Sequence, residues 1–255
     1  MSDRWCSNLG LNTKIIAHRG ASNDAPENTL SSVIEGFNQK SDGVEVDIRL
    51  TKDSKIVCHH DKSALRTTGV NKNIKDMSLE EVRAIECGSW FGKSWSNEKI
   101  PQLKDVLESL PEDKQIFIEV KTNEEIVPFL LELIYETGIS LGQLTIISFF
   151  PDVIKSIKRK ESHIKCNLLI AFDHQDMPIQ EILDLVVETK ADGIGAQNHE
   201  RLDERFIQSM KSIGKSVHVW TVNSNEEAER YYKSGIDSIT TNKPLSIRNY
   251  LEALK

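Results

Sequence analysis

The sequence predicts a (β/α)8 barrel, the TIM-barrel fold of the α/β class, on three observations. Short apolar runs rich in β-branched residues alternate with amphipathic stretches along the whole chain. Eight such pairs follow one another. The length of 255 residues is close to the ~250 residues typical of this fold. A doubly wound open sheet, which also alternates strands and helices, is the alternative.

The expected elements follow one another in a regular order. The apolar runs predict strands that begin near Ile15, Val44, Ile116, Leu144, Asn167, Gly193, Val217 and Ser238. The amphipathic stretches between and after them predict helices over residues 27–39, 103–110, 124–137, 151–160, 179–189, 203–213, 225–234 and 245–254. Short turns at 191–195 and 235–239 lead into two of the later strands, and this regularity favours closure of the sheet into a barrel.

One interval breaks the alternation. After the second strand comes another extended run over 55–60, and the next expected helix begins only at residue 103. We therefore interpret 62–100 as a small insertion within a single domain that spans residues 1–255. Long insertions in compact domains often form lids or binding loops, so Trp90, Phe91 and Trp95 are candidates for ligand contacts. The alternative is that these aromatic residues form a satellite core that holds the insertion together.

Composition argues against several classes of protein. Thirty-two Lys and Arg face 39 Asp and Glu, a net charge of −7, which argues against nucleic acid as a partner. No apolar run approaches the ~20 residues of a membrane helix, and the first residues lack the apolar stretch of a secretory signal. We therefore expect no stable membrane insertion and a cytoplasmic location. Nothing chooses between a monomer and a homodimer.

Cysteine spacing gives no sign of a structural metal or a disulfide framework. The four cysteines, Cys6, Cys58, Cys87 and Cys166, are scattered and form no C-x-x-C pair. We expect reduced thiols, some of them packed in the interior.

Acidic residues close two strands that otherwise look buried on both faces: Glu45 and Asp47 end the second strand, and Glu119 with Lys121 ends the third. Residues i and i+2 of a strand point to the same side, so Glu45 and Asp47 share one face, as do Glu119 and Lys121. A buried carboxylate without compensation costs several kcal/mol, so three inward acids imply a cation, and oxygen ligands imply a hard one. The sequence therefore predicts that Glu45, Asp47 and Glu119 hold one divalent metal ion.

Two histidine dipeptides stand at comparable positions, His18-Arg19 and His60-Asp61. In a barrel of this kind the active site lies at the carboxyl ends of the strands. Imidazole titrates near neutrality and can transfer protons, while fixed cations meet the negative charge that grows on a phosphodiester. The combination indicates metal-assisted hydrolysis of a phosphodiester. His59 points to the opposite face of its strand from His60 and is expected to be structural.

The sequence resembles the glycerophosphodiester phosphodiesterase family from about Ile15 to Pro244. The resemblance depends on a series of motifs in a shared order: Ala17-His-Arg-Gly20, Pro26-Glu-Asn-Thr29, Val44-Glu-Val-Asp47, His60-Asp61, Leu65-Arg-Thr-Thr68, Pro101 with Leu103, Ile118-Glu-Val-Lys121, Ser148-Phe149 and Val219-Trp-Thr-Val-Asn223. The family folds as a TIM barrel with a small segment inserted after the His-Asp motif.

The resemblance implies hydrolysis of small-molecule glycerophosphodiesters to sn-glycerol 3-phosphate and an alcohol, with Mg²⁺ or Ca²⁺ as cofactor. It makes His18 and His60 the acid–base pair and Glu45, Asp47 and Glu119 the metal ligands. Phosphate contacts would come from Arg19 and Lys121.

The resemblance also suggests roles for two residues that have plausible structural roles. Trp220 would pack on the glycerol moiety, although it could be a core residue. Glu27 would be a further carboxylate near the metal or Arg19, although it could simply favour a helix dipole. One position departs from the family: the eighth strand commonly ends in Thr-Asp-x-Pro, and this chain has Asn242 in place of the aspartate. A local hydrogen bond or pKa could differ there.

Two other functions remain open on the sequence alone. One is a lysophospholipase D-like activity on lysophospholipids, which would need an apolar groove. The other is a catalytically silent barrel that binds a phosphoester, but such a barrel would be expected to lack one of the histidines or carboxylates. No motif indicates which head-group alcohol is preferred.

Overall fold

Eight parallel strands close into a ring in the computed structural model, which describes residues 13–174 and 176–254. They run in the order β1-β9-β8-β7-β6-β5-β4-β2, and the pairing of β1 with β2 closes the ring. The barrel predicted from the sequence is confirmed. Its strands are β1 (Lys14–His18), β2 (Gly43–Leu50), β4 (Gln115–Val120), β5 (Leu144–Ser148), β6 (Lys165–Ile170), β7 (Gly193–Gln197), β8 (Ser216–Trp220) and β9 (Ser238–Thr241).

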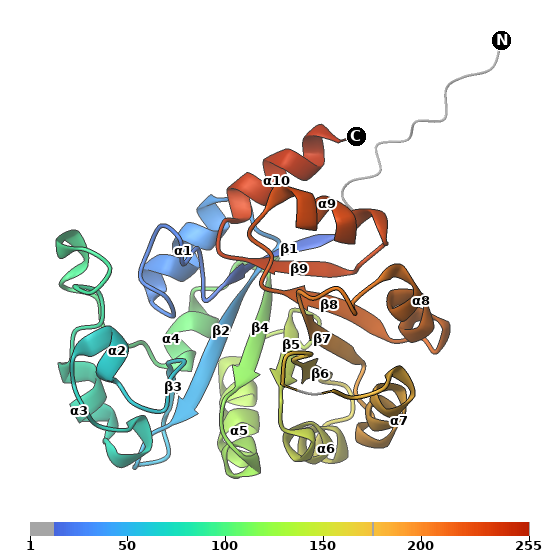
Figure 1. Ribbon diagram of the computed structural model, residues 1–255. Helices are drawn as coiled ribbons and strands as arrows, with labels where there is room; N and C mark the ends of the chain where they lie inside the picture. The colour runs from blue at the N-terminus through green and yellow to red at the C-terminus, as the bar shows by residue number, and fades with distance from the viewer. Residues whose placement is uncertain (1–12, 175, 255) are drawn as a thin grey trace.

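Helices surround this ring on its outer side (Figure 1). Each buries one apolar face against the strands; in α6, for example, Val153, Ile154 and Ile157 are buried. The main helices are α1 (Leu30–Asn38), α4 (Leu103–Glu108), α5 (Val127–Thr137), α6 (Pro151–Lys160), α7 (Ile179–Thr189), α8 (Glu204–Ser212), α9 (Asn225–Lys233) and α10 (Pro244–Ala253). No helix in the described part of the chain is both long and apolar enough to cross a bilayer.

Two helices begin later than the sequence predicts. The stretch expected to be helical from residue 27 becomes α1 only at Leu30, because Thr29 caps the helix and its side chain accepts a hydrogen bond from the Ser32 amide. Glu27 therefore lies in the preceding loop. The stretch expected from residue 124 starts as a 3₁₀ turn, η3 (Glu124–Ile126), before α5 begins with a proline in its first turn.

The segment between β2 and α4 begins with β3 and lies to one side of the ring (Figure 1). The short strand β3 (Ile56–Cys58) pairs antiparallel with the end of β2. After it come α2 (Leu65–Thr68), η1 (Ile74–Asp76), α3 (Leu79–Ala84) and η2 (Lys93–Trp95). This segment has its own small core, which includes Ile74, Met77 and Val82.

The aromatic residues of the insertion contact one another. Phe91 packs edge to face with Trp90 at 5.7 Å and with Trp95 at 6.3 Å between ring centroids. They do not belong to the small core of the insertion, and Trp90 is 43% exposed, so the expectation that they form that core is wrong. The three cysteines within the described residues, Cys58, Cys87 and Cys166, are free and buried, whereas Cys6 lies outside the described residues.

The inside of the barrel is packed below its carboxyl end. Ile16, Phe117, Ile147 and Leu169 form a buried cluster there, and Phe149 and Trp220 pack against it from above. His218 is also buried in this layer, stacked on Phe117 with 4.9 Å between ring centroids. The filled interior leaves the mouth at the carboxyl ends of the strands as the place where polar side chains can converge.

Candidate active site

Three carboxylates converge at this mouth. Glu45 and Asp47 lie on the same face of β2, and Glu119 of β4 is the register partner of Asp47. One oxygen from each of the three lies within 4.8 Å of the others. The sequence suggested that Glu45 and Asp47 close their strand, which is wrong, because β2 continues to Leu50 to pair with β3. They are nevertheless level with the end of β1, since His18 is the register partner of Glu45.

Burial makes this cluster electrostatically unstable without a cation. Burial and the charges of Asp47 and Glu119 raise the pKa of Glu45 well above its ordinary value. Burial and the Asp47 charge raise the pKa of Glu119 to about 7. Burial alone would raise the pKa of Asp47 too, but the charges of Arg19, Lys121 and His60 outweigh it and hold that pKa below its ordinary value. The three groups thus resist being ionised together.

Two of these carboxylate oxygens lack a hydrogen-bond partner. Glu45 Oε1 and Asp47 Oδ1 are buried and accept no hydrogen bond from the described residues. Buried polar atoms are rarely left in this state, and hard cations such as Mg²⁺ and Ca²⁺ take carboxylate oxygens as ligands. The residues present therefore fit a divalent cation held by Glu45, Asp47 and Glu119.

Two fixed cations flank the carboxylates. Arg19 Nε lies 3.1 Å from Asp47 Oδ2, and Lys121 Nζ lies 2.6 Å from Glu119 Oε1 and 3.7 Å from Asp47 Oδ1. Arg19 adopts a φ of 54°, unfavourable for a residue with a side chain. In this conformation its main-chain N–H donates to Glu45 Oε2 at 2.9 Å. The turn after β1 therefore brings both the backbone and the side chain of Arg19 to the cluster.

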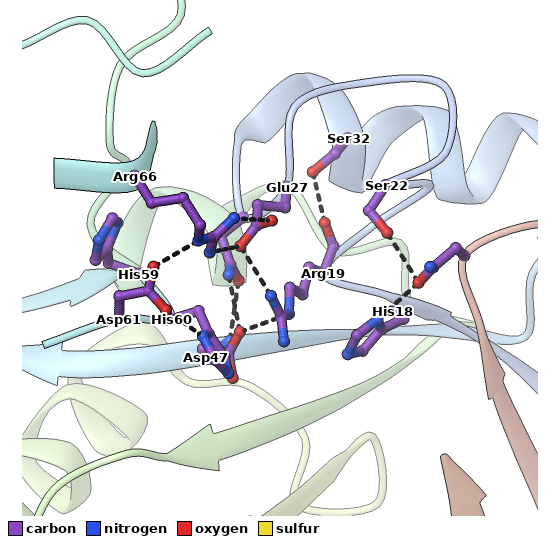
Figure 2. A network of polar contacts seen from close by, with 12 residues as sticks. His18, Arg19, Ser22, Glu27, Ser32, Asp47, His59, His60, Asp61 and Arg66 are labelled. Atoms are coloured by element: carbon purple, nitrogen blue, oxygen red, sulfur yellow. Dashed lines mark hydrogen bonds and ion pairs between the residues drawn. The ribbon is translucent and has the colours of Figure 1, made fainter. Parts of the chain in front are cut away.

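A chain of ion pairs joins His60 to these carboxylates (Figure 2). His60 Nδ1 donates to Asp61 Oδ1 at 2.7 Å, and Asp61 Oδ2 accepts from Arg66 Nε at 2.6 Å. The two Nη atoms of Arg66 then donate to both oxygens of Glu27, at 2.7 and 2.8 Å. Glu27 in turn accepts from Arg19 Nη1 at 2.9 Å. A bidentate contact of this kind orients both partners.

The network also changes the protonation of its members. Burial would favour the neutral acid of Glu27, but the hydrogen bonds and charges of Arg66 and Arg19 lower its pKa. Hydrogen bonds from Arg66 and His60 outweigh the effect of burial on Asp61 and lower its pKa to about 2. Both carboxylates are therefore ionised at neutral pH and hold their cationic partners.

His18 lies on the other side of the cluster, at the end of β1. Its Nδ1 donates to Asn242 Oδ1 at 2.7 Å, and its Nε2 lies 4.0 Å from Glu45 Oε2. Burial and the nearby charge of Arg19 lower the pKa of His18 to about 4. The ring is therefore neutral at pH 7 with Nε2 as its free acceptor, the form needed for a general base.

Residues 18–246 match the profile of the glycerophosphoryl diester phosphodiesterase family. The chain belongs to this family. The glycerophosphodiester phosphodiesterase of Caldanaerobacter subterraneus is 30% identical over 243 residues, which cover 94% of this chain and 98% of the relative. The prediction of this family, and with it of a phosphodiesterase, is confirmed.

Solved structures of glycerophosphodiester phosphodiesterases share the barrel. A phosphodiesterase of Oleispira antarctica, in complex with the product sn-glycerol 3-phosphate, superposes with a TM-score of 0.86 at 25% identity, covering 94% of this chain and 96% of that one. The Thermotoga maritima enzyme has a TM-score of 0.77 at 26% identity, covering 95% and 98%.

A cavity of about 550 Å³ adjoins the carboxylates of this phosphodiesterase family member. Its lining includes both candidate histidines and both cations, together with the apolar side chains of Ile147, Phe149, Leu169 and Trp220. Trp220 ends β8, packs edge to face on Phe149 at 5.6 Å, and donates from Nε1 to the Gly195 carbonyl at 3.0 Å. Trp220 therefore packs against the core with one part of its side chain and lines the cavity with another.

The site residues predicted from the sequence lie around this mouth. Glu27 and the aromatic residues of the insertion, however, do not line the cavity. Glu27 instead accepts a hydrogen bond from Arg19, which does line it. Among the described residues, none from 62–100 lines the cavity, so Trp90, Phe91 and Trp95 are not cavity residues. His59 is buried and its Nε2 donates to the Ser63 carbonyl at 3.2 Å, in line with a structural role.

Four residues at or near the site were missed or given no role by sequence reasoning. Asn28 donates to Asp47 Oδ2 at 2.9 Å and accepts from the Asp47 amide at 3.0 Å. Arg66 connects Glu27 with Asp61, as described above. Both stand within quoted family motifs, which was the available signal. His174 and His218 line the cavity, although they stand outside the motifs and gave no such signal.

Proposed function

We propose that this protein hydrolyses glycerophosphodiesters to sn-glycerol 3-phosphate and an alcohol, with one divalent metal ion held by Glu45, Asp47 and Glu119. The single observation that carries the proposal is the convergence of these three carboxylates, two of them with an oxygen that accepts no hydrogen bond, with two histidines and two cations at one mouth. The sn-glycerol 3-phosphate bound to the Oleispira antarctica relative supports the choice of product. We extend the proposal to residues 1–255 as one domain with 62–100 as its insertion.

The charges in the mouth match a phosphodiester that gains negative charge as it reacts. Arg19 and Lys121 are positioned to hold the nonbridging phosphate oxygens, because both lie beside the carboxylates and line the cavity. A bound Mg²⁺ or Ca²⁺ would add Lewis-acid stabilisation of the same charge. The apolar wall with Phe149 and Trp220 is suited to the carbon skeleton of the glycerol moiety.

Proton transfer is assigned to the two histidines. One imidazole takes the proton from the attacking oxygen, and the other donates a proton to the leaving alkoxide, each contributing ~10²–10⁴-fold. In the route implied by the family resemblance, the glycerol 2-hydroxyl attacks phosphorus and the alcohol leaves, giving a cyclic phosphate. Water then opens the ring with the roles of the histidines reversed. Asp61 and Asn242 hold the Nδ1 atoms of His60 and His18, which leaves both Nε2 atoms free for these transfers.

Release of glycerol 3-phosphate from glycerophosphocholine or glycerophosphoethanolamine tests this function. We expect release that EDTA abolishes and that Mg²⁺ or Ca²⁺ restores. His18→Ala and His60→Ala should each lower kcat by at least ~10²-fold without lowering the melting temperature, whereas His163→Ala, an exposed histidine, should change neither.

Three outcomes would contradict the proposal. Near-normal turnover in either catalytic histidine variant would refute the role given to that residue. Cleavage of lysophosphatidylcholine alone would replace the function by a lysophospholipase D activity. Inactivity on all three compounds, with metal present, would indicate a phosphoester-binding barrel.

A further inference from the structure

A second groove, of about 650 Å³, lies beside the active-site cavity. Its walls come from segments that follow the carboxyl ends of β2, β4 and β5 and from the start of the insertion, including η1. These are the same ends of the strands that carry the active site. The groove therefore opens on the face of the barrel where substrate enters.

The groove is strongly basic in an acidic protein. Five of its thirteen lining residues are Lys or Arg, namely Arg49, Lys52, Lys62, Lys75 and Lys121, and one is acidic, Glu125. The whole chain, by contrast, has 32 basic and 39 acidic residues. Positive charge concentrated against the overall sign of the chain raises the local concentration of anions.

Most of this charge is not neutralised by neighbouring carboxylates. Lys52, Lys62 and Lys75 form no ion pair within 4.0 Å in the part of the chain that the structure describes. Elsewhere on the insertion Lys72 does pair, with Glu81 at 2.7 Å. The three lysines of the groove are thus free to meet an anionic ligand.

Arg49 connects the groove with the catalytic residues. It is only 8% exposed, and its Nε donates to the His60 carbonyl at 2.9 Å while Nη1 donates to the Lys121 carbonyl at 3.3 Å. Among residues 13–174 and 176–254, no carboxylate oxygen lies within 4.0 Å of its guanidinium. Arg49 is thus a buried cation whose hydrogen bonds go to carbonyl groups, and the charges of Asp47, Asp61 and Glu119 act on it only from beyond 4.0 Å.

The groove adjoins the active-site cavity at Lys121. Lys121 lines both cavities, and Lys62 follows the candidate acid–base residue His60 by two positions. A glycerol moiety against Trp220 and a phosphate at Lys121 place the second alcohol of the diester on the side away from Trp220. That side is the one where the basic groove begins.

We propose that this groove binds a leaving alcohol that itself carries a phosphate group, so that diesters with a phosphorylated alcohol are preferred substrates. The inference rests on the proposed function and narrows its substrate class. A phosphomonoester carries nearly two negative charges at pH 7, which suits several unpaired lysines better than a choline or ethanolamine cation does.

A matched pair of substrates tests the proposal. Glycerophosphoinositol and glycerophosphoinositol 4-phosphate differ only in the phosphate on the leaving alcohol, and both release glycerol 3-phosphate. We expect the phosphorylated substrate to have the higher kcat/KM, and the ratio to fall about tenfold in Lys62→Gln/Lys75→Gln, at about threefold for each exposed cation. Lys93→Gln, an exposed lysine of the insertion outside the groove, should leave the ratio unchanged.

Equal kcat/KM values for the two substrates, with no change in the double variant, would overturn the groove as a phosphate site and leave the proposed function standing. Binding of myo-inositol 4-phosphate, measured by calorimetry against myo-inositol, decides the point without turnover. Tighter binding of the phosphate that weakens in the double variant supports the groove even if no diester is cleaved. Equal binding of both compounds refutes it.

Discussion

The Glu119→Gln variant tests the carboxylate cluster most directly, because it should stabilise the metal-free protein and remove its response to metal. Burial and Asp47 raise the pKa of Glu119 from 4.5 to about 7. At about 1.4 kcal/mol per pH unit, this shift corresponds to ~3 kcal/mol of folding free energy. Glutamine has no proton to lose, and its carbonyl can still accept from Lys121.

The sign of the effect follows from proton linkage. Between pH 4.5 and about 7 the folded protein binds a proton at Glu119 that the unfolded chain has released, so the metal-free protein loses stability as pH rises through this window. Below pH 4.5 the wild type and Glu119→Gln should differ little. At pH 8 in EDTA the variant should melt up to ~6–12 °C higher, at ~2–4 °C per kcal/mol for a chain of this size.

Metal should offset most of this difference between the two proteins. A ligand at 100 times its dissociation constant stabilises the folded state by ~2.7 kcal/mol, so saturating Mg²⁺ or Ca²⁺ should raise the melting temperature of the wild type by several degrees and that of the variant far less. Thermal unfolding at pH 5 and 8, with EDTA and with metal, measures all four states. Glu181→Gln, an exposed glutamate of α7, is the matched control and should follow the wild type. The reasoning fails if Glu119→Gln keeps the pH dependence and the metal shift of the wild type.

Three further predictions concern residues around the site and in the barrel. Arg66→Ala should lower kcat by about tenfold or more through misplacement of its two carboxylate partners, with a change of at most ~1 kcal/mol in stability because the side chain is 43% exposed. Asn242→Asp should raise the pKa of His18 above about 4, since a carboxylate 2.7 Å from Nδ1 favours the imidazolium; the acid limb of the pH profile of kcat/KM should move to higher pH. Gly43→Ala should destabilise the fold by ~1–3 kcal/mol, measured by denaturant unfolding, because its Cβ would lie 2.5 Å from the Gln115 carbonyl oxygen.

Two of these predictions have a control variant, and each has a result that would contradict it. Arg66→Lys keeps the charge but cannot bridge two carboxylates with a planar fork, so it should recover kcat only partly; full recovery would show that charge alone matters. If the acid limb of the kcat/KM profile does not move in Asn242→Asp, the ionisation of His18 does not determine that limb. Gly142→Ala places its Cβ 3.6 Å from Ser140 Oγ, an ordinary van der Waals contact, and should be tolerated. Equal losses of stability in both glycine variants would contradict the steric argument.

The parts of the site that sequence reasoning found are those set by local geometry. Alternation along a strand requires Glu45 and Asp47 to share a face, whatever the rest of the chain does. The same rule places Glu119 and Lys121 on one face, and in the structure Lys121 Nζ lies 2.6 Å from Glu119 Oε1. Two expectations about the ends of elements failed, because β2 is extended by its pairing with β3 and α1 is shortened by the Thr29 cap.

The contacts that orient the catalytic groups could not be read from the sequence, because their partners are far apart along the chain. Arg66 and Glu27 are separated by 39 positions and His18 and Asn242 by 224. Each meeting depends on how the ring closes, since β1 lies between β2 and β9. The motifs quoted for the family contained Arg66 and Asn28, but a motif states which residues recur together and not which atoms touch.

The sequence by itself determined the alternation of strands and helices, the barrel and the residue types of the site, because hydrophobic periodicity and strand alternation are properties of neighbouring residues. Only the tertiary structure decided which oxygens of the carboxylate cluster accept no hydrogen bond, how Arg66 links His60 to Arg19, and where four cations from β2 and the insertion side of the barrel join Lys121 in one groove. These features depend on register, closure of the ring and burial, which bring together charges from distant parts of the chain and remove them from water.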